Sequence, residues 1–512
     1  MIRKIILFAA LVFSLGSCTK DFKTINIDPN NSTKVPLNYL LTQTQLYIGG
    51  SAGDPGYATW RANLMYSLPV VQMFSSIGTY YGGDKYIYEA DLSEAYFVTQ
   101  YPESIKGLVD LINQAKVDPA NINLLSIARI EKALQMSMIT DLYGDVPYSE
   151  AGLGFLTTNF SPKYDAQKDI YADLLKELSE AGTALSSSAA TPGSADLVYG
   201  GDVTKWKHFA NSLMLRLAMR MQKVDPTSAQ TWAKTALDGG VMGSNAETFA
   251  IKYANDGGTA TINSNSYNMG PAVAPTRNEV ALGSMNWSKT LIDLMKSRND
   301  PRIPTISILP SGDATVASQK GLPNGLDVAK LTALTGETNI ANYSRPNPIL
   351  YSAVDPYILL PYAEVEFLKA EAIERGWYTG TAATAYAAGQ AAAVTQLIVD
   401  KGAPDLSGSV AAYQAANTYP ATNSADRIAQ IENEMFILCA STLNGFEGWA
   451  NWRRTGLPAL TPTNYPGNAT NGTIMRRLIY PVSEQGQNAN YAAAVAAQGP
   501  DLFTTRMWWD KQ

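Results

Sequence analysis

The sequence predicts a mainly α-helical fold built from stacked helix pairs. Three observations support this prediction. Apolar residues recur at three- and four-residue spacing over long stretches, Gly- and Pro-containing turns interrupt those stretches, and the helices form hairpins of roughly 35 to 45 residues, as in eroded tetratricopeptide-like repeats. One hairpin cannot bury its apolar face alone, so we expect the pairs to stack into a short superhelix. An irregular helical domain without true repeats is the alternative interpretation.

The chain begins with the pattern of a bacterial lipoprotein signal. Arg3 and Lys4 precede an apolar run, Ile5 to Leu15, that is too short to span a bilayer. The following Leu15-Gly16-Ser17-Cys18 resembles a lipobox, whose cysteine is acylated and becomes the first residue of the mature protein. We therefore predict a multi-chain lipid anchor on Cys18, which would hold the protein firmly on a membrane. An ordinary secreted protein is the alternative.

The signal sets the predicted domain organisation. Residues 1–17 are the signal peptide, residues 18–35 form a polar, turn-rich leash, and residues 36–512 form a single helical domain. No later apolar run is long enough to span a membrane.

The predicted elements follow from periodicity and turn residues. The expected helices, in chain order, are Pro36 to Tyr47, Trp60 to Phe74, Glu103 to Gln114, Leu124 to Tyr143, Ile170 to Leu185, Thr204 to Lys223, a long pattern within Tyr351 to Trp377, Ala382 to Val399, and Arg427 to Leu443. Gly144 and Pro147 end the fourth helix sharply, and Ser75 to Tyr88 is a Gly-broken, Tyr-rich loop. Long polar inserts, which tend to be functional or disordered, are Ala254 to Glu279, Ser307 to Pro346, Ser407 to Ser424 and Thr461 to Thr473.

Composition excludes several classes of function. Cleavage removes two basic residues and no acidic one, so the formal net charge changes from −6 to about −8, which argues against a nucleic-acid partner. The single histidine, His208, cannot supply a zinc site or a Ser-His pair. With Cys18 lipidated, Cys439 has no disulfide partner, and we expect a buried thiol. No P-loop or helix-opening GxGxxG is present, and we expect no cofactor.

Several motifs together resemble one family, the SusD or RagB nutrient-binding lipoproteins of Bacteroidetes. A single motif of this set would be weak, whereas the series in the family's order is specific and runs the length of the chain. Besides the lipobox, the matching motifs are Ile25 to Asn30, Arg129 to Ala151, Lys205 to Arg220, Asn299 to Pro304, Glu366 to Trp377, Phe446 to Pro458, Arg476 to Glu484, Asn490-Tyr491 and Trp508 to Asp510.

The resemblance implies a structure and a role. It implies a right-handed superhelix of four tetratricopeptide-like helix pairs that carries a variable ligand face. It also implies a non-catalytic lipoprotein on the outer membrane, facing the cell exterior, that captures oligosaccharide or polysaccharide for a SusC-like TonB-dependent transporter. Some branches capture peptides, so peptide or another nutrient is the alternative cargo, and a mainly structural lid is a third interpretation. The shared motifs belong to the scaffold and do not identify the ligand.

Candidate ligand contacts come from aromatic residues in the loops. A neutral sugar needs flat apolar faces and a few directional polar groups, and this chain has 28 Tyr and 9 Trp but only 16% charged residues. The candidates are Trp60, Tyr80, Tyr81, Tyr267, Arg277 and Trp287. The alternative for each is packing between helices, and that alternative is stronger for Trp60, which begins a helix-like run.

Other conspicuous groups have structural interpretations. Trp449 and Trp452 share a helix face beside Arg453-Arg454, and we expect these residues and the terminal Trp508-Trp509 to pack the scaffold. Glu364 and Glu366 are expected on the solvated side of a helix, and no carboxylate pair has the setting of a glycoside hydrolase. Asn255 to Gly258 lacks the ligand spacing of a calcium loop, so we expect no metal.

Overall fold

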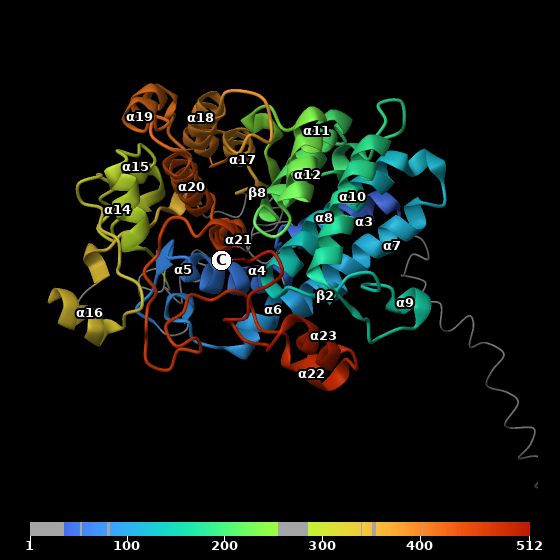
Figure 1. The fold of residues 1–512 in the computed structure, drawn as a ribbon, viewed down its shortest axis with the longest axis horizontal. Helices are drawn as coiled ribbons and strands as arrows, with labels where there is room; N and C mark the ends of the chain where they lie inside the picture. The colour runs from blue at the N-terminus through green and yellow to red at the C-terminus, as the bar shows by residue number, and fades with distance from the viewer. Residues whose placement is uncertain are drawn as a thin grey trace, which may run out of the picture.

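The chain folds, in a computed structural model, as antiparallel helices stacked on their sequence neighbours (Figure 1). The structure describes residues 35–51, 54–78, 82–253, 285–338, 340–350, 355–401 and 403–511. Within them α8 packs on α7 and α10, α11 on α10 and α12, and α17 on α18 and α20. The prediction of a mainly helical fold of stacked pairs is confirmed.

The helices have the following bounds. The first half contains α3 (Leu37–Ile48), α4 (Asp54–Trp60), α5 (Leu68–Val70), α6 (Ala90–Gln100), α7 (Lys106–Ala115), α8 (Ile122–Tyr143), α9 (Gly154–Thr157), α10 (Gln167–Ala184), α11 (Val203–Arg220) and α12 (Pro226–Asp238). The second half contains α14 (Lys289–Ser297), α15 (Ile303–Ile306), α16 (Val328–Thr335), α17 (Tyr362–Glu374), α18 (Ala382–Lys401), α19 (Val410–Ala416), α20 (Ser424–Ser441), α21 (Gly445–Thr455), α22 (Val482–Gln487) and α23 (Tyr491–Gln498). No helix within the described ranges combines enough length and apolar character to cross a bilayer.

Short antiparallel strand pairs join the inserts to the helices. They are β1 (Phe74–Ser75) with β5 (Asn286–Trp287), β2 (Val146–Pro147) with β3 (Tyr164–Asp165), β4 (Phe249–Ile251) with β8 (Tyr357–Leu360), and β6 (Ser307–Ile308) with β7 (Arg345–Pro346).

Some helix ends are predicted correctly from the sequence, and others are not. The α8 helix ends where expected, because Gly144 has φ +85° and its N–H donates to Thr140 O at 2.7 Å. The helix expected to begin at Glu103 instead begins at Ala90 and runs through Pro102, because a π-helical turn, Tyr101–Ile105, accommodates the proline. The helix expected over Trp60 to Phe74 begins at Asp54 and ends at Val70.

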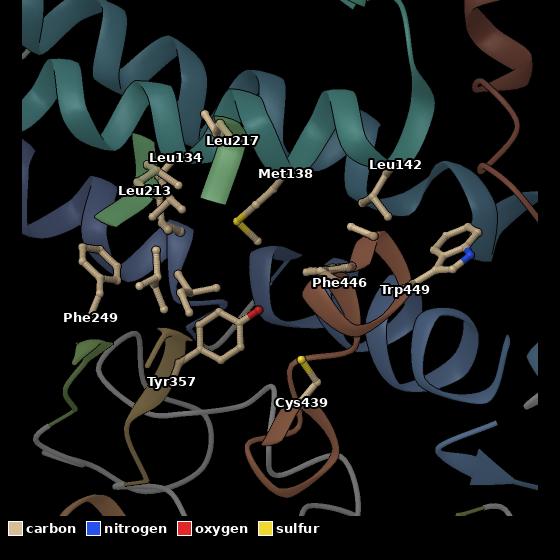
Figure 2. Packing of buried hydrophobic residues seen from close by; sticks show 14 of the residues in the cluster. Leu134, Met138, Leu142, Leu213, Leu217, Phe249, Tyr357, Cys439, Phe446 and Trp449 are labelled. Carbon is tan, nitrogen blue, oxygen red and sulfur yellow. The ribbon is translucent and has the colours of Figure 1, made fainter. Parts of the chain in front are cut away.

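The hydrophobic core draws side chains from both halves of the chain. Leu134, Met138 and Leu142 of α8 lie in one layer with residues of α11, β8 and α21 (Figure 2). Helix α21 packs against α5 and the π-helical stretch Arg61–Ser67, and Asn63 Nδ2 donates to Leu443 O at 2.8 Å. Residues near the two ends of the sequence are therefore neighbours in space.

The tryptophan and arginine motifs near the C-terminus fill this core, as predicted. The Arg453 guanidinium stacks 4.3 Å from the Trp449 ring centre, and Trp509 donates its indole N–H to Asp141 Oδ1 at 3.0 Å. Cys439 is buried in α20, and burial raises the pKa of its thiol well above the ordinary value.

The prediction that Glu364 and Glu366 face solvent is wrong. Both side chains are buried, and Glu364 accepts two hydrogen bonds from Arg216 of α11, at 2.5 and 2.7 Å. The charge of Glu364 is thus balanced by an arginine far away in the sequence. Burial still raises the pKa of Glu364 to about 7.

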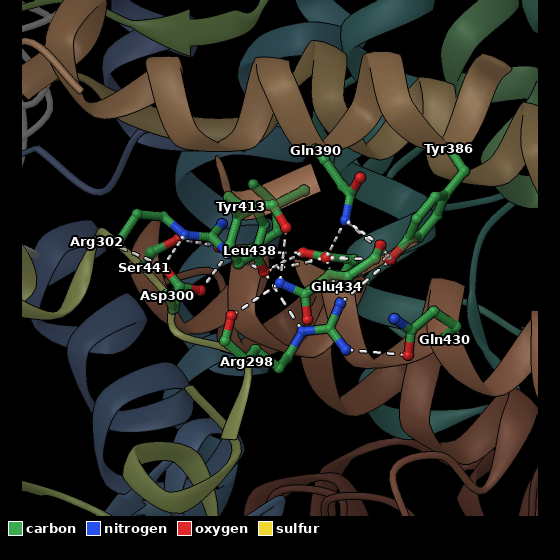
Figure 3. Close-up of polar contacts among 11 residues, drawn as sticks. Arg298, Asp300, Arg302, Tyr386, Gln390, Tyr413, Gln430, Glu434, Leu438 and Ser441 are labelled. Carbon is green, nitrogen blue, oxygen red and sulfur yellow. Dashed lines mark hydrogen bonds and ion pairs between the residues drawn. The ribbon is translucent and has the colours of Figure 1, made fainter. Parts of the chain in front are cut away.

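A second buried network fixes the segment between α14 and α15 to the C-terminal helices (Figure 3). Its centre is Glu434 of α20, which pairs with Arg298 and lies 3.6 Å from Arg302 Nη2. Gln390 Nε2 of α18 and the Tyr413 hydroxyl of α19 each donate to Glu434 at 3.0 Å. One carboxylate therefore connects four elements.

Glu434→Ala is expected to lower the free energy of unfolding by about 3–5 kcal/mol, because it leaves Arg298 buried without its counter-charge. Urea unfolding measures this loss. The control is Glu180→Ala, which removes a half-exposed partner of Arg129 and should cost about 1 kcal/mol or less. Equal losses for the two variants would contradict the role given to Glu434.

Candidate functional site

Two segments predicted to bind ligand meet at one strand pair. Ser75 of β1 lies opposite Asn286 of β5 in antiparallel register. The chain that leaves β1 toward Tyr80 and Tyr81 therefore starts at the same end of the pair where the insert 254–284 enters β5. The structure thus brings together the bases of two loops that are about 200 residues apart in the sequence.

A groove of about 520 Å³ lies beside this strand pair. We call it the β1–β5 groove. Four segments line it: Gln72 before β1, the first turns of α14, the stretch Pro323–Leu326 with Lys330 of α16, and residues 461–464. Its volume is within the ordinary range for small-ligand sites, and most of its lining groups are amides, hydroxyls and paired charges.

Gln72 forms the floor of the groove in a backbone conformation that is rare for a residue with a side chain. Its φ is +58°, in the left-handed region. Its side chain donates to Thr461 O at 2.5 Å and accepts from the Thr290 hydroxyl at 3.0 Å. These contacts hold opposite walls of the groove together and stabilise the strained backbone.

The charges that line the groove are paired within it. Lys289 pairs with Asp293 along α14, and Lys330 Nζ lies 2.8 Å from Asp327 Oδ2. Hydrogen bonds from Lys330 lower the pKa of Asp327 to about 2. Lys330 also lies 4.4 Å from the centre of the half-exposed Tyr465 ring, whose hydroxyl donates to Asp327 at 3.0 Å. Tyr465, which follows Asn464 of the groove wall, is therefore held in place by an ion pair.

Asp84 and Gly83 fix the segment that follows Tyr80 and Tyr81. Buried Asp84 accepts hydrogen bonds from Gly325 N at 3.0 Å and from the Ser75 hydroxyl at 3.2 Å, and pairs with Lys85 at 3.0 Å. Gly83 lies so close to the preceding helix that an added Cβ would be 2.6 Å from Met65 O. The predicted loop Ser75 to Tyr88 is therefore anchored on both sides of Tyr80 and Tyr81.

The predicted ligand residues have different outcomes. Tyr80, Tyr81, Tyr267, Arg277 and the lipidation residue Cys18 lie outside the described residues, so they stay predictions.

The two predicted tryptophans are both buried. Trp287 is fully buried, stacks 4.6 Å from Phe74, and donates its indole N–H to Ile306 O at 3.0 Å. Trp60 is also buried, with its ring centre 5.0 Å from that of Tyr57. Because neither ring presents a free face to solvent, we do not include them in the proposed contact surface.

Sequence reasoning missed Gln72, Lys330 and Tyr465. Lys330 and Gln72 have no distinctive local pattern, whereas Tyr465 lies in the predicted polar insert Thr461 to Thr473 and could have been selected as a loop aromatic. Among the described residues, no three His, Cys, Asp or Glu side chains lie together as metal ligands would, and Asn255 to Gly258 lies outside the described residues.

A helical scaffold that carries an open groove with paired charges defines a binding protein. The family model described as "Starch-binding associating with outer membrane", a SusD-like family, matches residues 29–481. The chain belongs to this SusD-like family, whose members are non-catalytic binding proteins associated with the outer membrane.

Solved structures agree with this assignment. The chain is similar to a chitin-binding protein at 32% identity and a TM-score of 0.81, over 93% of this chain and 100% of that one. It is similar to a SusD homologue from Bacteroides uniformis at 26% identity and a TM-score of 0.73, over 93% and 99% of the two chains. A chitin-binding SusD homologue from Flavobacterium johnsoniae, at 23% identity and a TM-score of 0.77 over 93% and 99%, shares the fold. A comparison with curated proteins gave no match.

Gly83→Ala is expected to destabilise the protein by about 1–3 kcal/mol, because the new methyl group would overlap the backbone carbonyl of Met65. Gly408→Ala is the matched control, since a Cβ there meets nothing within 4 Å. Thermal unfolding of both variants measures the difference. A Gly83→Ala protein as stable as Gly408→Ala would show that the loop is not held closely against the helix.

Proposed function

We propose that the protein binds oligosaccharide or polysaccharide at the β1–β5 groove and delivers it to a SusC-like TonB-dependent transporter. The observation that carries the proposal is the pairing of the bases of two predicted ligand loops beside a groove whose wall is followed by the immobilised Tyr465. The chitin-binding protein that shares 32% identity supports a carbohydrate cargo.

The chemistry of the groove favours a neutral glycan over a charged ligand. The half-exposed Tyr465 ring, which follows Asn464 of the groove wall, is the proposed stacking surface for sugar C–H groups. Asn464 and Thr463 add an amide and a hydroxyl for directional hydrogen bonds. Because the lysines and aspartates that line the groove are already paired, they provide no free charge for a polyanion or a peptide terminus. Tyr80, Tyr81, Tyr267 and Arg277 are proposed as further contacts from the two loops.

The proposed location is the outer leaflet of the outer membrane. A lipid on Cys18 would tether the domain, residues 36–512, through the leash of residues 18–35. Val35 is seventeen positions after Cys18, and an extended leash of that length reaches at most about 60 Å. The domain could therefore stay close to a transporter in the same membrane and still face the exterior.

The first experiment is electrophoresis of residues 19–512 in native gels that contain chitin derivatives, starch, xylan or other polysaccharides. Retardation by one polymer supports glycan capture and names its class. No retardation by any polymer, together with binding to a peptide library, would replace glycan with peptide as the cargo.

Tyr465→Ala is expected to weaken binding of the retarding polymer by about tenfold, because it removes the stacking face at the groove rim. Titration calorimetry measures the affinity. Tyr465→Phe keeps the ring and should bind nearly as well as the wild type, and Tyr39→Ala removes an exposed tyrosine from α3 as a matched control. Unchanged affinity for Tyr465→Ala would exclude this rim from the site.

Cys18→Ala is expected to move the protein from the membrane fraction to the soluble fraction of the cell, because the lipid can no longer be attached. Cys439→Ala, which removes the buried thiol of α20, is the matched control and should remain in the membrane fraction. Membrane retention of Cys18→Ala would contradict the lipid anchor.

A further inference from the structure

A second concave site lies on the described surface, outside the β1–β5 groove. It is a cleft of about 260 Å³ with Tyr88, Pro481, Val482 and Tyr491 as walls and Tyr480 and Asp501 at its base. We call it the Tyr88 cleft. Its walls come from the chain that follows the Tyr80–Tyr81 loop and from the region around α22 and α23.

The aromatic walls of the cleft are partly exposed, and hydrogen bonds hold them in place. Tyr88 is 39% exposed, and the hydroxyl of Tyr66 fixes the backbone on both sides of it, donating to Ile87 O at 2.9 Å and accepting from Glu89 N at 3.0 Å. The Tyr491 hydroxyl donates to Asp501 Oδ2 at 3.1 Å. Because the rings are already ordered in the free protein, less entropy is lost when a ligand stacks on them.

The charge at the base of the cleft is already balanced. Asp501 lies 2.8 Å from Arg477 Nη2 and also accepts from Tyr480 N at 3.2 Å. The accessible chemistry is therefore aromatic and apolar, from Tyr88 and from Val482, which is 60% exposed, with the exposed Gln485 amide at the rim. Flat rings beside a neutral amide suit a sugar ring, whereas a peptide would need a strand edge or an unpaired charge, and the residues that line this cleft supply neither.

The groove wall contacts the segment that leads to the cleft. Thr463, in the groove wall, donates its hydroxyl to Asp84 O at 2.5 Å and its N–H to the Tyr86 hydroxyl at 3.3 Å. Asp84 and Tyr88 are four residues apart, so their Cα atoms lie at most about 14 Å from each other. We propose that one extended polymer spans both sites along this side of the protein.

We infer that the Tyr88 cleft is a second carbohydrate subsite, which takes a sugar unit of the same neutral glycan chain that occupies the β1–β5 groove. This inference rests on the proposed glycan binding. Occupation of both sites makes the second contact intramolecular, so affinity rises with chain length. The protein thereby selects polymers and long oligosaccharides over their short fragments.

The test compares affinities of the wild type and of Tyr88→Ala for chitin, starch and xylan and for oligomers of each from disaccharide to octasaccharide. Tyr88→Ala should bind the polymer and the longest oligomers about tenfold more weakly and should bind the shortest bound oligomer as the wild type does. Tyr88→Phe, which keeps the ring, should retain wild-type affinities, and Tyr39→Ala is the control for loss of an exposed tyrosine elsewhere.

The outcomes separate this inference from the proposed function. A wild type that binds no carbohydrate at any length overturns both. If the wild type binds carbohydrate and Tyr88→Ala binds every chain length with the same affinity, the second subsite is overturned. The proposed site in the groove is then retained. Gln485→Ala is an independent test, because the exposed Gln485 side chain can be removed without disturbing the core. This variant should have reduced affinity only for long glycan chains.

Discussion

Buried ion pairs between arginines and carboxylates are the interaction on which the rest of the structure depends. Glu434 connects α20 to α18, α19 and the end of α14, and Glu364 connects α17 to α11. Burying each ion pair costs free energy, and separating its partners inside the protein costs more. Each contact between these elements therefore has essentially one acceptable geometry. Apolar packing could accommodate small shifts of one helix on another, whereas a two-pronged guanidinium contact cannot. The helix pairs therefore form a rigid base for the inserts between them.

That rigidity extends to the proposed ligand surface. Helix α14 begins at the groove with Lys289 and ends at Ser297, next to Arg298 of the Glu434 network, so the helix is fixed at both ends. Asp84 and Gln72 hold the other walls through hydrogen bonds to residues far away in the sequence. The segment from Asp84 to Tyr88 connects a hydrogen bond of the groove wall to the Tyr88 cleft, so the scaffold fixes the spacing of the two sites. A scaffold of this kind can keep its core while loops at its surface change their specificity.

Local patterns predicted much of the scaffold and little of the site. The α8 helix and its end were predictable because apolar spacing, Gly144 and Pro147 act within a few residues. Glu364 was mistaken for a surface residue because its partner, Arg216, lies 148 residues away. The insert Ala254 to Glu279 and the tyrosines Tyr80 and Tyr81 lie outside the described residues, so their loop predictions stay predictions. The approach of the two loop bases depends on the pairing of two-residue strands, which have no recognisable sequence signal. Trp287 looked like a loop aromatic because burial by remote segments cannot be seen in its neighbours.

We propose that glycan binds where the bases of the two loops pair, beside β1 and β5. A crystal structure of the protein with the longest soluble oligosaccharide of the polymer that retards it tests this claim most directly. We expect sugar rings in the groove between α14 and residues 461–464, with one ring stacked on Tyr465. The sugar chain should continue toward Tyr88. Sugar bound on another face, with the groove and the cleft both empty, would contradict it.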